Sequence, residues 1–139
     1  MIKKTVILVG TPTWSQDVDL AALSPISKKY RKNVMYTLHF YAGTHGQWLR
    51  DKAQIALDKE LPLFVSEFSI CDASGNGNLN KKEAKKWLSF LDRNKISLCG
   101  MEFCQTKGRV LLLSGQTVKK PGNGLLKSDC VRKMDYKLV

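Results

Sequence analysis

The stretch PLFVSEF, residues 62–68, decides the fold class of this chain. It is an apolar run of strand composition that ends in one carboxylate, Glu67, and residues of turn type follow soon after it. A buried strand of an α/β barrel delivers an acid to the mouth of the barrel in this way. The alternative is a strand that ends where solvent begins, in which case Glu67 only marks its exit.

Two further apolar runs place polar and aromatic side chains at strand ends. Residues 33–41 end in His39 and Tyr41, which are two residues apart and therefore lie on the same side of a strand. Residues 5–10 form a short apolar strand, and the loop after it carries Trp14. An acid, an imidazole and a phenol beside a flat indole are groups that suit a sugar-binding cleft.

Strand-like runs recur along the chain at about the length of one βα unit. They begin near Thr5, Val34, Leu63 and Ile96. This spacing predicts an α/β fold in which parallel strands alternate with helices over residues 5–103.

Two helices are predicted between these strands. The first has an apolar stripe made by Trp48, Leu49, Ala53, Ala56 and Leu57, with Arg50 and other charged residues outside it. The second begins at a capping box formed by Asn80 and Glu83, and Ala84, Trp87, Leu88 and Leu91 line one of its faces. We expect Trp48 and Trp87 to pack in the core or against a helix rather than to stack on a ligand, and the lysines at positions 81, 82, 85 and 86 to be solvated.

The net charge of +11 raises nucleic acid as a partner. The excess is concentrated at the end of the chain, because residues 105–139 carry eight basic and two acidic side chains. No recognition helix or stacking motif of a nucleic-acid module is visible, so we expect no nucleic-acid partner. Residues 105–139 show neither helical nor strand periodicity, which predicts a basic, weakly ordered tail.

The cysteines and the N-terminal residues exclude several other classes. Cys71, Cys99, Cys104 and Cys130 form no C-x-x-C pair, so we expect reduced thiols and neither a metal cluster nor a disulfide framework. The apolar run after Lys4 is too short for a signal peptide, and no stretch is long enough to cross a membrane.

Four stretches of the sequence resemble bacterial endo-β-1,4-glucanases of glycoside hydrolase family 5. They are GTPTWSQD at residues 10–17, MYTLHFYAGTH at 35–45, LRDK at 49–52 and FVSE at 64–67. The resemblance runs over roughly residues 5–100, and it implies strands five to eight of a (β/α)8 barrel. Residues 1–104 would then be a half TIM-type barrel, the C-terminal half of a cellulase catalytic domain, and residues 105–139 its tail.

The same resemblance implies roles for individual residues. Glu67 would be the nucleophile of a retaining glycosidase, His39 and Tyr41 would position it and the sugar, and Trp14 and His45 would bind the substrate. A retaining enzyme also needs a second carboxylate about 5 Å away as acid/base. In the family that residue belongs to an Asn-Glu-Pro motif, which is absent here. The family's Trp-Gly after the nucleophile is Phe68-Ser69 here, and its later Trp-Asn is Met101-Glu102.

The resemblance also implies partners and a location. The ligand would be a β-glucan or cellulose oligosaccharide, no cofactor is implied, and members of the family are secreted. A half barrel leaves two open edge strands and an uncovered core, so we expect a homo-oligomer.

A rival hypothesis is a non-catalytic binding protein. Residues 72–83 fit the spacing of an EF-hand loop, with Asp72, Ser74, Asn76 and Glu83 as ligands of calcium. The alternative without calcium is a surface loop followed by the helix cap at Asn80. Binding of a polyanion by the basic tail is the other non-catalytic possibility.

Overall fold

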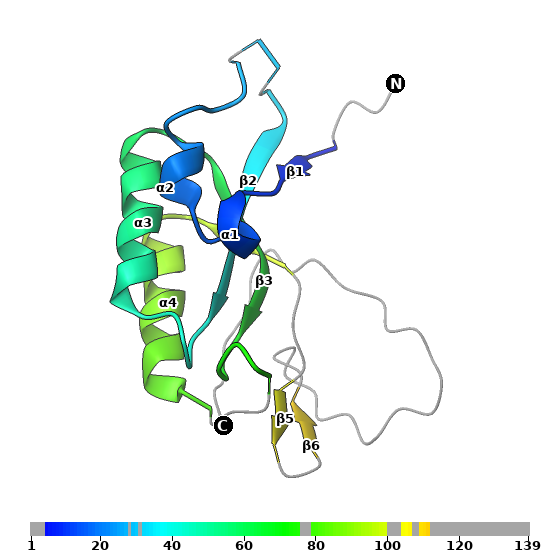
Figure 1. The fold of residues 1–139 in the computed structure, drawn as a ribbon, viewed down its shortest axis with the longest axis vertical. Helices are drawn as coiled ribbons and strands as arrows, with labels where there is room; N and C mark the ends of the chain where they lie inside the picture. Colours follow the sequence, from blue (N-terminus) through cyan, green and yellow to red (C-terminus); the bar gives the residue numbers. More distant parts are fainter. Residues whose placement is uncertain are drawn as a thin grey trace.

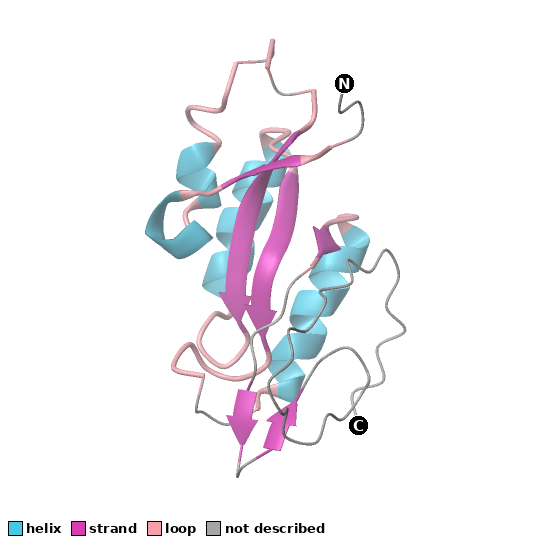
Figure 2. Cartoon of the chain, turned by 90° about the vertical axis from the view of Figure 1, so that its right-hand side faces the viewer, coloured by secondary structure: helices cyan, strands magenta, loops and turns pink. Residues whose placement is uncertain are grey.

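The computed structural model describes residues 5–27, 29–30, 32–75 and 79–99, and the backbone of 104–106 and 109–111. Four strands form one parallel sheet in the order β1-β2-β3-β4, with bounds Ile7–Val9, Val34–Tyr41, Leu63–Ser69 and Ser97–Leu98. Figure 1 shows the elements in chain order, and Figure 2 shows the two long central strands running in the same direction. The predicted alternation of parallel strands and helices is confirmed.

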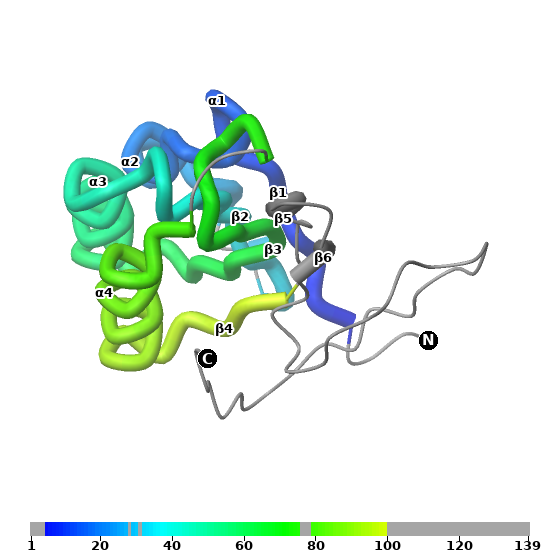
Figure 3. The backbone as a smooth tube through the Cα atoms, turned by 90° about the horizontal axis from the view of Figure 1, so that it is seen from below, coloured from blue at the N-terminus to red at the C-terminus, as the bar shows by residue number. Residues whose placement is uncertain are grey.

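Three of the four described helices lie along one face of this sheet. The bounds of the four are Pro12–Ser15 for α1, Val18–Ala21 for α2, Gln47–Asp58 for α3 and Lys81–Arg93 for α4. Figure 3 shows α2, α3 and α4 on the same side of the strands. No helix among the described residues is long and apolar enough to cross a membrane.

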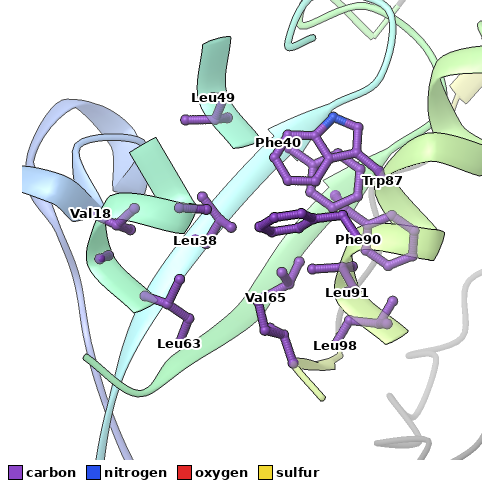
Figure 4. Close-up of a cluster of buried hydrophobic side chains, with 14 of the residues drawn as sticks. Val18, Leu38, Phe40, Leu49, Leu63, Val65, Trp87, Phe90, Leu91 and Leu98 are labelled. Carbon is purple, nitrogen blue, oxygen red and sulfur yellow. The ribbon is translucent and has the colours of Figure 1, made fainter. Parts of the chain in front are cut away.

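The core fills the space between the sheet and the helices (Figure 4). Strand β2 contributes Val34, Tyr36, Leu38 and Phe40, every second residue, and the helices contribute Leu49, Ala53, Trp87 and Leu91 among others. Full burial of one such aliphatic side chain stabilises the fold by about 1.5–3 kcal/mol. Because β2 alternates, Thr37, His39 and Tyr41 lie on the opposite face of the sheet, away from α2, α3 and α4.

A bulge in β3 changes which of its side chains face the core. The pairing with β2 runs from Val65 opposite Leu38 directly to Glu67 opposite His39, so Ser66 is the extra residue. Leu63 and Val65 precede the bulge in the core, and Phe68 and Ile70 follow it there. Glu67 therefore lies on the same face as His39.

Helix α4 begins as predicted. The Asn80 side chain accepts a hydrogen bond from the Glu83 backbone N–H at 3.0 Å, and the four lysines of this helix are exposed. Trp87 is fully buried.

One expectation about α3 is wrong. Trp48 is 46% exposed and its ring contacts that of His45, whereas Arg50, expected outside the buried face, is 3% exposed and forms an ion pair with Glu83. An ionic partner on a neighbouring helix compensates the burial of the guanidinium, which the spacing within α3 does not reveal.

Two other expectations concern the cysteines and the tail. Cys71 is disulfide-bonded, so the expectation of reduced thiols is wrong at this position. Strands β5, Cys104–Thr106, and β6, Arg109–Leu111, form an antiparallel pair at the start of the tail. Most of the predicted tail lies outside the described residues, and its separation from residues 1–104 stays a prediction.

Candidate active site

Three polar side chains meet where β2 and β3 end. The Tyr41 hydroxyl donates a hydrogen bond to Glu67 Oε1 at 2.5 Å, and His39 Nδ1 lies 3.7 Å from Glu67 Oε2. Both strands are parallel, so all three groups lie at the carboxyl end of the sheet, as the sequence predicts. The Glu67 side chain is 38% exposed, so a ligand can reach its carboxylate.

His39 is held by the residue that makes the bulge. Its Nε2 lies 2.8 Å from the hydroxyl of Ser66. Burial lowers the pKa of His39 below its ordinary value, and the nearby Glu67 carboxylate opposes this effect only in part. The imidazole is therefore mainly neutral at pH 7, and it can form one hydrogen bond with a ligand. Sequence reasoning missed Ser66.

His45 supports Tyr41 from below the surface. Its Nδ1 accepts a hydrogen bond from the Tyr41 backbone N–H at 2.9 Å, and its ring makes an edge contact with the Tyr41 ring at a centroid distance of 5.8 Å. Its carbonyl accepts from Trp87 Nε1 at 2.7 Å, and burial lowers its pKa. His45 is only 4% exposed, and its role in substrate binding stays a prediction.

The loops that follow β2 and β3 pack closely against each other. A side chain at Gly43 would place its Cβ 2.5 Å from the backbone nitrogen of Asp72, so only glycine fits there. The Gly43 N–H also donates to the Cys71 carbonyl at 2.7 Å. This contact fixes the ends of the two strands that carry the three polar side chains.

Trp14 lies in α1, which follows β1 and is a tight loop rather than a regular helix, since Thr13 and Trp14 do not have helical φ and ψ; its side chain is 82% exposed. It sits within three consecutive residues of left-handed backbone, with φ of 53° at Thr13, 51° at Trp14 and 62° at Ser15. Each such residue costs about 1–2 kcal/mol when it is not glycine. An indole presented in this way offers a flat apolar surface to a ligand.

Comparison with known proteins connects this geometry to a family. The family model for Cellulase (glycosyl hydrolase family 5) matches residues 2–107. The chain belongs to glycosyl hydrolase family 5. An endoglucanase of Clostridium saccharobutylicum is 46% identical over 113 residues, which are 81% of this chain and 25% of that protein.

Solved structures of glycosyl hydrolase family 5 cellulases agree with the fold. The cellulase Cel5C_n matches with a TM-score of 0.64 and 54% identity over 69% of this chain and 28% of that chain. The catalytic domain of a Thermobifida fusca endoglucanase, in complex with cellotetraose, matches with a TM-score of 0.58 and 28% identity over 69% of this chain and 32% of that one. The parallel sheet and its helices therefore correspond to part of the family's TIM barrel.

The structure also bears on the calcium hypothesis for this family 5 chain. Glu83 forms ion pairs with Arg50 at 2.5 Å and with Lys86 at 3.0 Å, so its carboxylate is already engaged by two basic side chains. Asp72 Oδ1 accepts hydrogen bonds from the backbone N–H and the hydroxyl of Ser74. Asn76, the remaining predicted ligand, lies outside the described residues. Among the described residues, no group of three or more His, Cys, Asp or Glu side chains could hold a metal ion.

Proposed function

We propose that this protein is an endo-β-1,4-glucanase, or a fragment of one, that cleaves β-1,4-glucosidic bonds by a retaining mechanism. The cluster of Glu67, Tyr41 and His39 at the carboxyl end of two adjacent parallel strands carries this proposal. The chain spans about a quarter of the Clostridium endoglucanase, so the activity of the whole relative comes to this chain as a proposal only.

Glu67 is the nucleophile in this proposal. Its carboxylate attacks the anomeric carbon, the bond from that carbon to the leaving oxygen breaks, and water later hydrolyses the glycosyl ester. The Tyr41 hydroxyl donates to one carboxylate oxygen and so fixes the orientation of the other. His39, held by Ser66, provides a hydrogen bond to the carboxylate or to the sugar.

The acid/base partner of Glu67 is not assigned to any residue of this chain. The sequence contains no Asn-Glu-Pro motif. A leaving group that departs without protonation therefore suits this protein better than an unactivated glucan. A substrate with such a leaving group therefore provides the sharpest test of Glu67 as the nucleophile.

The ligand in this proposal is a β-glucan or cellulose oligosaccharide. The Thermobifida relative is in complex with cellotetraose, which makes cellotetraose a suitable probe. We also propose a homo-oligomer, because edge strand β1 and the residue before it expose Val6, Ile7 and Leu8 by 41–56%. Secretion is proposed from the family resemblance.

The test of Glu67 uses 2,4-dinitrophenyl 2-deoxy-2-fluoro-β-cellobioside. Dinitrophenolate leaves with its electron pair and needs no acid, while an ester bond forms from Glu67 to the anomeric carbon. We expect one added fluorocellobiosyl group by mass spectrometry, and peptide mapping should place it on Glu67. Glu67→Gln should abolish labelling and any hydrolysis of carboxymethyl-cellulose.

The matched control is Glu60→Gln, which changes an exposed carboxylate just before β3. This variant should be labelled as fast as the parent protein. Circular dichroism should show that both variants fold. Labelling that persists in Glu67→Gln, or that maps to another carboxylate, would overturn the catalytic assignment and favour a non-catalytic binding protein.

A further inference from the structure

The loop that presents Trp14 holds a backbone conformation that its residues do not favour. Thr13, Trp14 and Ser15 are all left-handed, and none of them is glycine. Such a run persists only where surrounding contacts over-determine it. Trp14 itself is 82% exposed, so burial of its own indole contributes little to holding the loop.

One end of the turn is anchored to the sheet. The hydroxyls of Ser15 and Thr37 are 2.6 Å apart, and the Thr11 hydroxyl donates to the Thr37 carbonyl at 3.1 Å. The Thr11 N–H also donates to Ser15 Oγ at 3.4 Å. All three residues are buried, so this anchor joins the turn to the middle of β2.

The other end of the turn is anchored to helix α3 by an ion pair. The Thr13 hydroxyl donates to Asp17 Oδ2 at 2.5 Å, and Lys52 Nζ lies 2.5 Å from Asp17 Oδ1. Asp17 is 15% exposed and Lys52 is 32% exposed, so water screens this pair less than a pair on the open surface. The hydrogen bond from Lys52 lowers the pKa of Asp17, and the hydrogen bond to Asp17 raises the pKa of Lys52.

Lys52 also contacts Trp48 of α3, which lies next to the residues that support Tyr41. Its Nζ lies 5.6 Å from the ring centroid of Trp48, and Trp48 makes an edge contact with His45. His45 in turn supports Tyr41. Lys52 therefore lies between the Trp14 loop and the support of the proposed nucleophile.

We infer that Asp17 and Lys52 are positioning residues for carbohydrate binding, whose ion pair holds Thr13 so that Trp14 is presented to a glucose ring of a β-1,4-glucan. This inference rests on the proposed function, because it needs a glucan ligand. The pair acts on the loop and touches neither Glu67 nor the bond that breaks. It therefore determines the affinity for the ligand more than the rate of the chemical step.

The test compares Lys52→Met with Lys52→Arg, which keeps the charge, in the full chain. Lys85→Met on the exposed face of α4 is the matched control for the loss of a lysine. The first readout is hydrogen exchange of the Ser15, Gln16 and Asp17 amides, which donate to carbonyls within the turn. The second is the dissociation constant for cellotetraose, and the third is the labelling rate of Glu67 at a saturating concentration of the fluorocellobioside.

In Lys52→Met we expect faster exchange at the three amides and cellotetraose binding weaker by roughly twofold to fivefold, since the loss of a partly screened ion pair changes an affinity by up to about fivefold. The saturating labelling rate should change much less than the affinity. Lys52→Arg should restore both the exchange and the affinity, and Lys85→Met should resemble the parent. This pattern would support the inference, because a general loss of fold would not spare the labelling rate.

Other results would overturn the inference. Unchanged exchange in Lys52→Met would show that the ion pair does not hold the turn. Faster exchange with unchanged affinity would show that the held turn does not serve sugar binding. A parent protein that binds no cellotetraose would instead contradict the proposed function, while the exchange of the amides would still report on the ion pair.

Discussion

Replacement of Trp87 by phenylalanine should destabilise the fold and also disturb the candidate site. Trp87 lies in α4, is fully buried, and stacks on Phe40 at a centroid distance of 4.2 Å. Its Nε1 donates to the carbonyl of His45 at 2.7 Å, and the Arg50 guanidinium carbon lies 5.1 Å from the ring centroid. Phenylalanine keeps part of the stacking but has no donor.

The magnitude follows from these contacts. Leaving the buried His45 carbonyl without its donor costs about 1–3 kcal/mol. The smaller ring leaves a space against Phe40 and weakens the contact with Arg50, which adds about 1 kcal/mol. We therefore expect Trp87→Phe to lower the free energy of unfolding by about 2–4 kcal/mol.

The assay is urea unfolding followed by circular dichroism at fixed protein concentration, with the m-value compared between variants. Trp48→Phe is the matched control, because the same substitution at a residue that is 46% exposed should cost less than about 1 kcal/mol. Labelling of Glu67 should also slow in Trp87→Phe, since His45 supports Tyr41. Equal losses of stability at the two tryptophans would refute this reasoning.

Three further predictions concern single side chains. Tyr41→Phe should slow labelling of Glu67 by roughly tenfold to a hundredfold, because a hydrogen bond to a charged group contributes about 1.5–3 kcal/mol; an unchanged rate would contradict this role. Burial raises the pKa of Glu83, but Arg50 and Lys86 outweigh it and hold the pKa below its ordinary value of 4.5. The stability from ionised Glu83 should therefore be complete above pH 4.5 and be lost as the pH falls through the lower folded pKa; Glu83→Gln should flatten the melting temperature across this range. Millimolar calcium should leave the melting temperature unchanged, and an increase that Asp72→Ala abolishes would revive the calcium hypothesis.

Much of the fold could be predicted because it depends on local patterns. Apolar runs near Thr5, Val34, Leu63 and Ile96 predict the four strands, and the capping box at Asn80 predicts the start of α4. Parallel strands bring their carboxyl ends to one edge of a sheet. That rule predicts that His39, Tyr41 and Glu67 lie at the same edge, and the bulge at Ser66 then places Glu67 on the face of the other two.

Other features depend on tertiary partners that the local sequence pattern does not reveal. Arg50 lies beside the apolar stripe of α3, and it is buried because Glu83 of α4 pairs with it across the core. His45 follows β2 in a segment that reads as a polar loop, yet it is buried under Tyr41 and Trp87. In both cases the compensating group lies in contact only after the helices have packed.

The bulge at Ser66 shows how a break in a pattern can carry function. Strict alternation along β3 would put Glu67 on the core face with Leu63 and Val65. An ionised carboxylate there would lose its hydration without a partner. The apolar positions instead change phase after Val65 and resume at Phe68 and Ile70, so the sequence already contains the signal of a bulge. Because the extra residue is a serine whose hydroxyl contacts His39, one residue both turns Glu67 toward the open face and holds the imidazole beside it.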